Sequence, residues 1–514
     1  MSELPPVTPL DEHNQTLLGN VHPPEWRNPE PEGRYNLVVL GAGSAGLITS
    51  AIAAGLGAKV ALVERHYLGG DCLNVGCVPS KGVIRASRMA AEARRAEKEV
   101  GLALAPGAEV DFAAAMERMR RIRAEISHED AAARYRDELG VDVYLGDARF
   151  TGRDTVEVAG TTLRFAKAVI ATGARAIALP IEGLEEAGYL TNETIFNLTE
   201  RPRRFGVIGA GPIGCEMAQA FRRLGSEVTL LHADAHILPR EDADAAKIVE
   251  ARFAEEGIRL GNACKIERLE RSGAEKVIHF RHPDGRTDRV VVDELLLGVG
   301  RAPNVEGLDL EKVGVRYDAR RGVHVNDFLQ TSNPRIYAAG DICMQWKFTH
   351  AADAAAKIVV QNALFFHRVP FMKKKLSALV MPWCTYTDPE VAHVGLYPAD
   401  AAAAGIEIDT FLVPLRQVNR AVADGEDEGF VKVITKKGSD EILGGTIVAA
   451  HAGEMISEIT LAMVGKLGLG RILDVIHPYP TQAEGIKRAA GLYTRERATP
   501  GVLKWMSRWM ALQR

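Results

Sequence analysis

Two cysteines five positions apart, Cys72 and Cys77 in GGDCLNVGCVPSK (residues 69–81), are the side chains best suited to chemistry. A zinc site would need two further Cys or His ligands at short spacing, and this segment supplies neither. Inert core thiols are an alternative, but the flanking Gly-Gly and Pro-Ser-Lys are a poor context for plain core packing. The spacing lets the sulfurs meet across about one helical turn, and a helix N-terminus with Lys81 one turn beyond would lower a thiol pKa. The segment therefore favours a redox-active disulfide.

A glycine-rich turn follows the first strongly apolar run of the chain. In YNLVVLGAGSAGLITSAIAAGLGAKVALVER, Gly41, Gly43 and Gly46 form G-x-G-x-x-G. Between a strand and a helix these glycines permit a tight turn, let the backbone approach a pyrophosphate and let helix and strand pack closely. The helix N-terminus favours phosphate binding, and Glu64, at the end of the next strand, can accept a bond from a ribose hydroxyl. The pattern predicts a dinucleotide site.

The same order of strand, glycine turn, helix and strand is predicted for FGVIGAGPIGCEMAQAFRRLGSEVTLLH, where the glycines are Gly209, Gly211 and Gly214. The position that held an acid in the first copy is His232. Without the carboxylate, a 2′-phosphate would be tolerated and His232 could meet it, which favours NADPH over NADH. A surface turn that merely contains histidines is the alternative. Two copies of one pattern form an internal repeat and predict two nucleotide-binding domains.

The composition of the chain argues against several classes of function. Of 514 residues, 46% are hydrophobic and 25% charged, and the net charge is -4, so no special affinity for nucleic acid or anionic lipid is expected. Six cysteines are too few for a disulfide framework, which indicates a reduced, cytoplasmic protein. The N-terminal stretch lacks the apolar run of a signal peptide, and we find no uninterrupted apolar run long enough for a membrane span.

The fold class predicted is α/β, with two three-layer Rossmann-like dinucleotide-binding domains and an α+β C-terminal dimerisation domain. The proline-rich N-terminus predicts a loosely ordered arm. The tail, TPGVLKWMSRWMALQR, is a candidate basic amphipathic helix that we expect to cap the subunit; a membrane surface is the alternative. The predicted boundaries are 1–34 for the arm, 35–185 and 305–381 for the two parts of the first dinucleotide-binding domain, 186–304 for the second dinucleotide-binding domain, 382–495 for the C-terminal domain and 496–514 for the tail.

Further motifs follow the cysteine pair in order: AVIATG, the second glycine turn with Glu216, LLLGVGRAPN, IYAAGDI and HPYPTQAEG. Over residues 35–495 this series resembles the FAD-dependent pyridine nucleotide–disulfide oxidoreductases, which include dihydrolipoamide dehydrogenase, glutathione reductase and mercuric reductase. The resemblance implies FAD and NADPH or NADH as cofactors, and a homodimer. No metal ligands are expected.

The resemblance also implies roles for individual residues. Cys77 would lie against the isoalloxazine as a charge-transfer thiolate, and Cys72 would face the substrate. Lys81 and Glu216 match an ion pair near the reactive nitrogen of the flavin, although an acid early in a helix is also favoured by the dipole alone. The expected cofactor-binding residues are Gly41, Gly43, Ser44, Gly46, Glu64, Gly70, Lys81, Thr172, Gly173, Gly209, Gly211, Gly214, His232, Arg301, Gly340 and Asp341.

The C-terminal motif departs from the members that act on dithiols. Their proton-shuttling histidine stands immediately before Pro-Thr, where this chain has Tyr479; His477 matches an earlier histidine and Glu484 the acid of the dyad. A phenol titrates near 10 and is a poor base at neutral pH. Mercuric reductases resemble the chain more closely here, because they too carry Pro-Tyr and a Glu-Gly segment.

The likeness to mercuric reductases is incomplete. They end in a vicinal cysteine pair, whereas the last cysteine here is Cys384, and the chain has no N-terminal C-x-x-C metal-binding domain. A soft metal needs a thiolate relay to cross a thiol-rich cytoplasm. We therefore expect electrons to pass from NAD(P)H through FAD and a Cys72–Cys77 disulfide to a metal ion or a disulfide-like small molecule. The alternatives are a dihydrolipoamide dehydrogenase and a redox-sensing flavin subunit without turnover.

Overall fold

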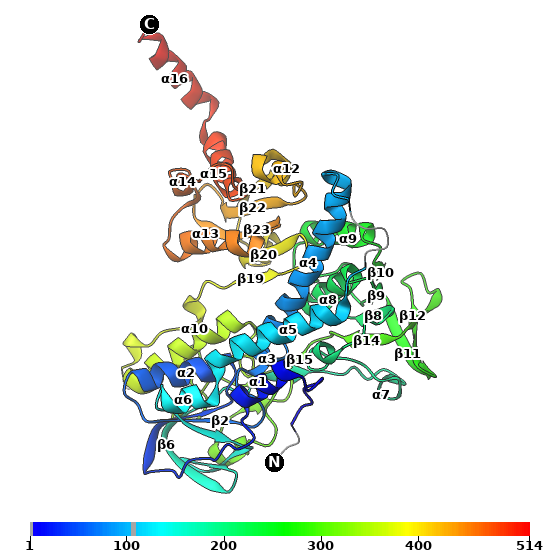
Figure 1. Cartoon of the computed structure of the whole chain (residues 1–514). Helices are drawn as coiled ribbons and strands as arrows, with labels where there is room; N and C mark the ends of the chain where they lie inside the picture. Colours follow the sequence, from blue (N-terminus) through cyan, green and yellow to red (C-terminus); the bar gives the residue numbers. More distant parts are fainter. Residues whose placement is uncertain (1–3, 104–108, 368) are drawn as a thin grey trace. The chain divides into compact units, whose positions relative to one another are not determined.

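The computed structural model describes residues 4–103, 109–367 and 369–514. The chain forms two compact units, and each is described by itself. Unit 1 comprises Met1–Asp234 and Glu256–Leu379, and unit 2 comprises Ala235–Glu255 and Val380–Arg514. The α/β fold class is confirmed, since unit 1 contains two parallel sheets of the Rossmann type and unit 2 an antiparallel sheet with helices (Figure 1).

The first sheet of unit 1 carries the first glycine turn at the end of its central strand. The strand order is β3-β2-β1-β6-β5-β4, and β18 also pairs with β6. Strands β1, β2, β3, β6 and β18 are parallel. The inner strands are almost wholly apolar because both faces are covered, one by the helix Ser44–Gly55 and the other by apolar residues of 148–158 and 305–323. The strands are β1 (Arg34–Leu40), β2 (Val60–Glu64), β3 (Asp142–Leu145), β4 (Ala148–Gly152), β5 (Thr155–Val158), β6 (Thr161–Ile170) and β18 (Ile336–Ala338).

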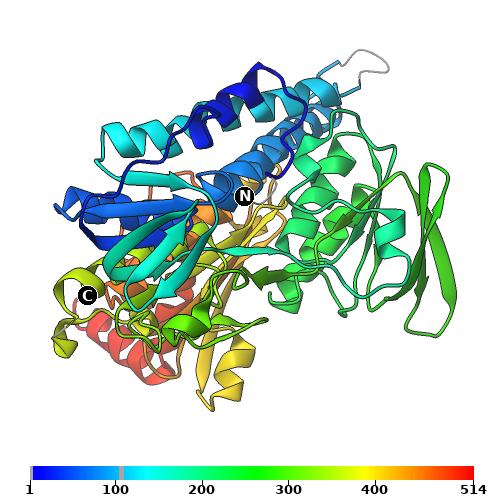
Figure 2. The same cartoon turned by 90° about the horizontal axis from the view of Figure 1, so that it is seen from below.

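The second sheet repeats this arrangement in the order β10-β9-β8-β14, with all pairs parallel. A separate antiparallel sheet, β11-β12-β13, is inserted in the chain between β10 and β14 (Figure 2). The strands are β8 (Arg204–Ile208), β9 (Glu227–Leu231), β10 (Arg259–Gly261), β11 (Lys265–Ser272), β12 (Glu275–Arg281), β13 (Thr287–Val292) and β14 (Glu294–Leu297), and two short pairs are β7 (Ala174–Ala176) with β15 (Arg301–Pro303) and β16 (Tyr317–Asp318) with β17 (Gly322–Val323).

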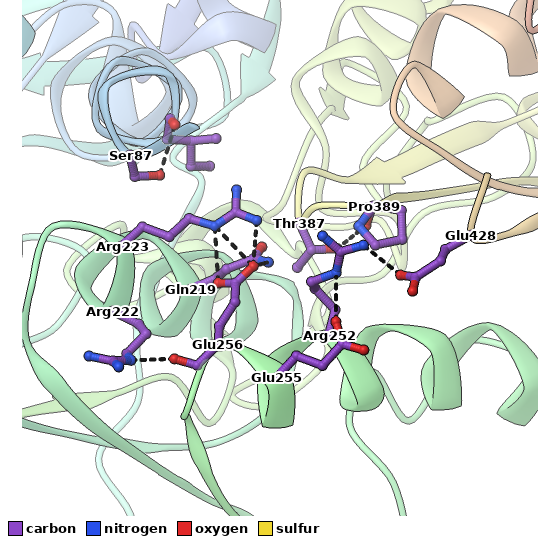
Figure 3. Close-up of polar contacts among 11 residues, drawn as sticks. Ser87, Gln219, Arg222, Arg223, Arg252, Glu255, Glu256, Thr387, Pro389 and Glu428 are labelled. Carbon is purple, nitrogen blue, oxygen red and sulfur yellow. Dashed lines mark hydrogen bonds and ion pairs between the residues drawn. The ribbon is translucent and has the colours of Figure 1, made fainter. Parts of the chain in front are cut away.

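The helices of unit 1 link the two sheets, since α4 packs against both α5 and α8. At the end of α8, the buried Arg223 holds Glu256 through Nη2 at 2.5 Å and Nε at 3.0 Å (Figure 3). The helices are α1 (Glu12–Val21), α2 (Ser44–Gly55), α3 (Gly70–Asn74), α4 (Cys77–Glu99), α5 (Phe112–Ile126), α6 (Ala132–Asp137), α7 (Leu184–Ala187), α8 (Pro212–Arg223) and α10 (Thr349–Val360), with short turns η1 (Ser127–Asp130), η2 (Ile195–Asn197), η3 (Leu310–Val313), η4 (Gln361–Phe365), η5 (Pro370–Met372) and η6 (Leu376–Ala378).

The N-terminal arm is ordered, so the prediction of a loose arm is wrong for residues 4–34; residues 1–3 lie outside the described part. Helix α1 starts at a cap in which Asp11 accepts a bond from the Asn14 backbone, and its Leu17 is buried. The buried Arg123 donates to Asn14 Oδ1 and to the Asn74 carbonyl, both at 2.7 Å. The arm is therefore tied, through one guanidinium, to the segment that carries the cysteine pair. The composition of the arm led to a wrong prediction of disorder because a few buried apolar residues are enough to dock a short helix.

Unit 2 is built on an antiparallel sheet in the order β19-β20-β23-β22-β21. Helices α13 and α15 pack on it around one apolar core. The strands are β19 (Pro382–Thr385), β20 (Glu390–Gly395), β21 (Ile408–Pro414), β22 (Phe430–Lys436) and β23 (Ile442–Ala449); the helices are α9 (Ala243–Glu255), α11 (Pro398–Ala403), α12 (Asn419–Ala423), α13 (Ala452–Val464), α14 (Leu469–Ile472), α15 (Glu484–Arg497) and α16 (Pro500–Ala511), with one turn, η7 (Leu415–Gln417).

Segment 235–255 belongs to unit 2 although it comes from the middle of the second nucleotide-binding repeat. The buried Glu241 accepts hydrogen bonds from Trp383 Nε1 and the Tyr397 hydroxyl, and Arg252 Nη2 binds Glu428 at 2.5 Å (Figure 3). The domain boundaries inferred from the sequence stay a prediction. They place the segment 235–255 in the second nucleotide-binding domain, because no sequence motif links it to the C-terminal sheet. In the part of the chain that the structure describes, no helix is both long and apolar enough to cross a membrane.

Candidate active site

The first glycine turn has the geometry of a phosphate cradle. Gly41 has φ +101°, and a Cβ on Gly46 would lie 1.8 Å from the Gly41 carbonyl oxygen, so both positions require glycine. A Cβ on Gly43 would meet only Gly70 Cα, at 3.7 Å. The two ends of the turn, Gly41 and Gly46, therefore leave no room for a side chain, whereas the space beside Gly43 is open. In dinucleotide sites a pyrophosphate approaches the backbone at this middle position. Ser44 begins α2, whose N-terminus offers free N–H groups.

Glu64 closes β2 beside this turn. Its Oε2 accepts a bond from Ala42 N at 2.6 Å and its Oε1 from His66 N at 2.8 Å. Burial raises the pKa of this carboxyl, although both backbone bonds oppose the effect. The carboxylate predicted to meet a ribose thus lies at the glycine turn, oriented by main-chain donors.

Two loops predicted to contact the cofactor are joined to each other. The Thr172 hydroxyl donates to the Asn304 carbonyl at 2.9 Å, and Gly173 has φ +68°. A Cβ on Gly340, which has φ +82°, would lie 3.2 Å from Ala45 Cβ, so the loop holding Gly340 packs against α2. A Cβ on Gly41 would lie 3.0 Å from Thr172 Cα, so the loops of Thr172 and Gly340 both lie beside the first glycine turn.

Arg301 connects one of these loops to the redox segment. Its guanidinium forms ion pairs with Asp71 and with Asp341, the latter at 3.6 Å, and donates to the Ala174 carbonyl at 2.6 Å. Burial raises the pKa of Asp341, and the charges of Arg301 and Lys347 oppose that shift. Asp71, the residue next to Cys72, is therefore linked through Arg301 to Asp341, one of the expected cofactor-binding residues.

The redox segment lies against the glycine turn, because a Cβ on Gly70 would come within 2.6 Å of Gly43 Cα. Cys72 is in the short helix α3, and Cys77 is the first residue of α4. Both thiols are free and share a hydrogen bond, so the structure has the dithiol form. Cys77 Sγ also lies 3.4 Å from the Thr349 hydroxyl at the start of α10.

The two thiols have opposite acidities. The hydrogen bond from Cys72, with help from Thr349 and the positive charge of Lys81, lowers the pKa of Cys77 to about 6. The same hydrogen bond and burial raise the pKa of Cys72. Cys77 is therefore the thiolate of the pair and Cys72 its donor, a division that the start of α4 favours through its dipole.

Lys81 and Glu216 form an ion pair one turn along α4. Lys81 Nζ lies 2.9 Å from Glu216 Oε2, and the Glu216 side chain is only 5% exposed. This contact joins the redox helix to α8, the helix that follows the second glycine turn. A cation held by a buried carboxylate is thereby fixed close to Cys77.

Above about pH 6, we expect reduced protein to carry a Cys77 thiolate. The thiolate, not the thiol, reacts with iodoacetamide, so the labelling rate of Cys77 should rise with pH and reach half its plateau near pH 6. Lys81→Met removes a charge that stabilises the thiolate and leaves Glu216, so its midpoint should move to higher pH. Quantifying the labelled peptide by mass spectrometry across the titration tests this; a midpoint near 9 in the parent protein contradicts it.

The second glycine turn repeats the first. Gly209 has φ +104°, a Cβ on Gly214 would lie 1.9 Å from the Gly209 carbonyl oxygen, and a Cβ on Gly211 would meet nothing within 4 Å. The open position again lies at the start of a helix, α8. His232 is buried at the end of β9, and its Nε2 lies 3.0 Å from Asn262 Oδ1. The turn fits a second dinucleotide, while the His232 ring lies inward.

The three predicted residues of the C-terminal motif have separate partners in unit 2. The Tyr479 hydroxyl accepts a bond from Asn419 Nδ2 at 3.0 Å, and this side chain is 72% exposed. His477 Nε2 lies 2.9 Å from Glu458 Oε1. Glu484 forms an ion pair with Arg488, one turn along α15. Among the contacts of the described residues in one subunit, neither Tyr479 nor His477 pairs with Glu484.

Sequence reasoning missed three residues at the cysteine pair. Thr349 lies in FTHAADA, just after the GDI motif, and a helix start there was the available signal. Asp71 adjoins Cys72, but its partner Arg301 is far away in sequence. Asp130, whose pKa burial raises to about 6, lies against Gly69 and disfavours ionisation of Cys72. No sequence pattern indicated that it would reach this site.

Comparison with known proteins agrees with this geometry. The family model of the pyridine nucleotide-disulphide oxidoreductases matches residues 35–356, and the model of their dimerisation domain matches residues 381–490. A mercuric reductase of Lysinibacillus sphaericus is 35% identical over 465 residues, which cover 90% of this chain and 84% of that protein. A dihydrolipoyl dehydrogenase of Chlamydia muridarum is 32% identical over 88% of this chain and 95% of its own.

Among solved structures, a Cu(II) complex of the HOCl-induced flavoprotein disulfide reductase RclA from Escherichia coli has a TM-score of 0.79 at 25% identity. The match covers 90% of this chain and all of that one. The likeness therefore extends over both nucleotide-binding sheets and the C-terminal sheet.

Proposed function

The chain belongs to the pyridine nucleotide-disulphide oxidoreductase family, and from that premise we propose that it passes electrons from NADPH, through FAD and the Cys72–Cys77 pair, to a soft metal ion. Enzymes of this family use FAD and NAD(P)H. The single observation that carries the proposal is the pair itself: a thiolate at Cys77 and a thiol at Cys72, sharing a hydrogen bond beside a phosphate cradle.

The residues around the first glycine turn fit FAD. Gly43 leaves room for the pyrophosphate, and Glu64, Thr172 and Asp341 lie on the loops around it. Bound FAD supplies a relay for two electrons between NAD(P)H and the cysteine pair. We assign Lys81 and Glu216 to the reactive edge of the flavin, because their ion pair lies between the redox helix and α8.

In the proposed reaction the cysteine pair would donate two electrons to the metal ion, and the thiol of Cys72 would release a proton. Two electrons leave the dithiol, which closes to the Cys72–Cys77 disulfide, and a divalent metal becomes the neutral atom. The pair enters that step as one thiolate and one thiol, so a single proton leaves from Cys72. The hydride of NADPH carries two electrons and one proton, which together restore the thiolate and the thiol, so each turnover consumes one NADPH and releases one proton.

Tyr479 favours a metal over a dithiol substrate. Dithiol oxidation needs a base to accept a thiol proton, and a phenol serves poorly at neutral pH. We propose that Tyr479 of the partner subunit completes the site, since its exposed hydroxyl has only one bond within its own chain among the described residues. The likeness to mercuric reductases and to a copper-bound flavoprotein disulfide reductase supports a metal acceptor.

The open second turn supports NAD(P)H without choosing between the two forms, and we retain NADPH because the position that matches Glu64 of the first copy holds His232 instead of an acid. The dimerisation-domain match supports a homodimer. Several apolar side chains in that domain are exposed in the single chain and suit a subunit interface: Leu461, Val464, Leu467, Val475 and Ile476. We place the enzyme in the cytoplasm, where its thiols stay reduced.

Side-by-side assays of the FAD-loaded enzyme test the acceptor. Thiol-buffered Hg(II) should support NADPH oxidation roughly tenfold or more faster than dihydrolipoamide supports NAD reduction. Tyr479→His supplies an imidazole, so it should raise the dihydrolipoamide rate by about 10-fold or more and leave the metal-dependent rate within about twofold. Tyr479→Phe serves as the matched control without a titrating group.

Two outcomes would contradict the metal assignment. Rapid turnover of dihydrolipoamide by the parent enzyme would make it a dihydrolipoamide dehydrogenase. Absence of turnover with every acceptor, together with normal reduction of bound FAD by NADPH, would favour the redox-sensing alternative.

A further inference from the structure

Helix α16 is an independent element at the C-terminal side of unit 2. Helix α15 ends at Arg497, and α16 starts anew with Thr499 as its cap and Pro500 in its first turn. Thr499 Oγ1 accepts a bond from Val502 N, so the start is fixed by a local signal. Every residue of α16 is exposed, and Figure 1 draws it in red beyond α15. Nothing in the described chain covers it.

The helix is amphipathic despite that exposure. At 3.6 residues per turn its apolar side chains occupy one half of the circumference, and Lys504, Ser507 and Arg508 lie on the other. Trp505 and Trp509 stack at i and i+4 with ring centroids 6.1 Å apart. The apolar half consists of Val502, Leu503, Trp505, Met506, Trp509, Met510 and Leu512, which are 44–83% exposed.

The charge of this segment is opposite to that of the whole chain. From Ala498 to Arg514 the basic residues are Lys504, Arg508 and Arg514, and there is no Asp or Glu, whereas the chain carries a net charge of -4. Two of the three cations lie on the polar half of α16. Local charge, rather than net charge, decides what a surface element attracts.

A second copy of the chain is one candidate to cover the apolar half. The dimerisation-domain match ends at residue 490, before α16 begins, and that domain has its own exposed apolar side chains. A segment with tryptophans on one face, cations on the other and no acid instead has the composition of a helix that lies in a membrane interface. Its 12 residues span about 18 Å, too short to cross a bilayer.

We propose that α16 docks the enzyme on an anionic lipid surface. The two tryptophans, Leu503 and the methionines enter the headgroup boundary, and Lys504 and Arg508 pair with lipid phosphates. The whole-chain charge predicts no special affinity for anionic lipid, and the proposal departs from that prediction for α16 alone. The proposal does not depend on which acceptor the enzyme reduces.

Flotation of the full FAD-loaded enzyme with vesicles tests this inference. Vesicles containing phosphatidylglycerol should carry the protein upward, and pure phosphatidylcholine vesicles should carry much less. Lys504→Gln with Arg508→Gln should lower the partition coefficient by about 25-fold together, and Trp505→Ala with Trp509→Ala by roughly tenfold or more. Since α16 buries no residue of its own unit, the variants should keep the parent melting temperature.

Phe371→Ala is the matched control, because Phe371 is an aromatic residue with 88% exposure outside α16, and it should float like the parent. Equal flotation of the parent and the tryptophan variant would overturn the proposal. So would dissociation of the dimer by that variant in size-exclusion chromatography with light scattering, since α16 would then serve the partner subunit.

Discussion

Cys77→Ser is expected to lower the proposed NADPH-dependent reduction of a metal ion by at least about 10³-fold while FAD stays bound. Cys77 supplies the thiolate of the pair, and its pKa of about 6 keeps it ionised at neutral pH. A serine hydroxyl at the start of α4 would neither ionise there nor form a disulfide with Cys72. Steady-state rates and the flavin absorbance of the purified variant measure both effects.

The two cysteines can be separated by one spectrum. Cys72→Ser should lose turnover to the same extent. Its hydroxyl can still donate a hydrogen bond to Cys77, and Thr349 and Lys81 remain, so the Cys77 thiolate and the long-wavelength absorption between thiolate and oxidised flavin should be kept. Cys77→Ser should lose that absorption. Cys264→Ser, at a buried cysteine of the β11–β13 region, should keep both activity and spectrum. Turnover by Cys77→Ser near the parent rate would refute the assigned pair.

Gly46→Ala should prevent the first nucleotide-binding turn from forming. The added Cβ would lie 1.8 Å from the Gly41 carbonyl oxygen, a contact of backbone with backbone that no side-chain rotation relieves. We expect a loss of about 3 kcal/mol or more in the free energy of unfolding and a protein purified without FAD. Thermal unfolding and the ratio of flavin to protein absorbance measure the two.

Gly43→Ala is the informative partner of that variant. Its Cβ would meet only Gly70 Cα, at an ordinary contact distance of 3.7 Å, so the apoprotein should unfold at the parent temperature. The methyl group would occupy the open side of the turn, and the affinity for FAD should fall by about 10-fold or more. If Gly43→Ala bound FAD as tightly as the parent, the pyrophosphate would lie elsewhere.

The parts of the fold that the sequence predicts are those governed by local chemistry. Gly41 and Gly46 must be glycine for reasons within one turn, and the same holds for Gly209 and Gly214, so both parallel sheets follow from the pattern. The parts that escape prediction depend on partners distant in the chain. Glu241 accepts hydrogen bonds from Trp383 and Tyr397. No rule of sequence spacing predicts that an acid from the middle of the second nucleotide-binding repeat binds residues of the C-terminal sheet.

The residues of the candidate site also fall into two groups: those that a sequence motif predicts and those that only the fold brings to the cysteines. Lys81 and Glu216 were named from motifs, and the structure brings them together at 2.9 Å. Thr349 and Asp130 were not named, because a hydroxyl or a lone acid carries no signal until the fold places it beside the cysteines. Arg301 was named as a cofactor residue, and its ion pair with Asp71 gives it a position that the motif alone could not define.

The hydrogen bonds of Arg123 have a consequence for how such an enzyme can diverge. The family match begins at residue 35, so Asn14 lies in a segment outside the shared catalytic core, yet one guanidinium connects it to the loop of Cys72. A segment outside the family match is thus linked, through Arg123, to the backbone of Asn74 between the two cysteines. Reduction potential or substrate preference could drift through substitutions there while every motif of the common core stays unaltered.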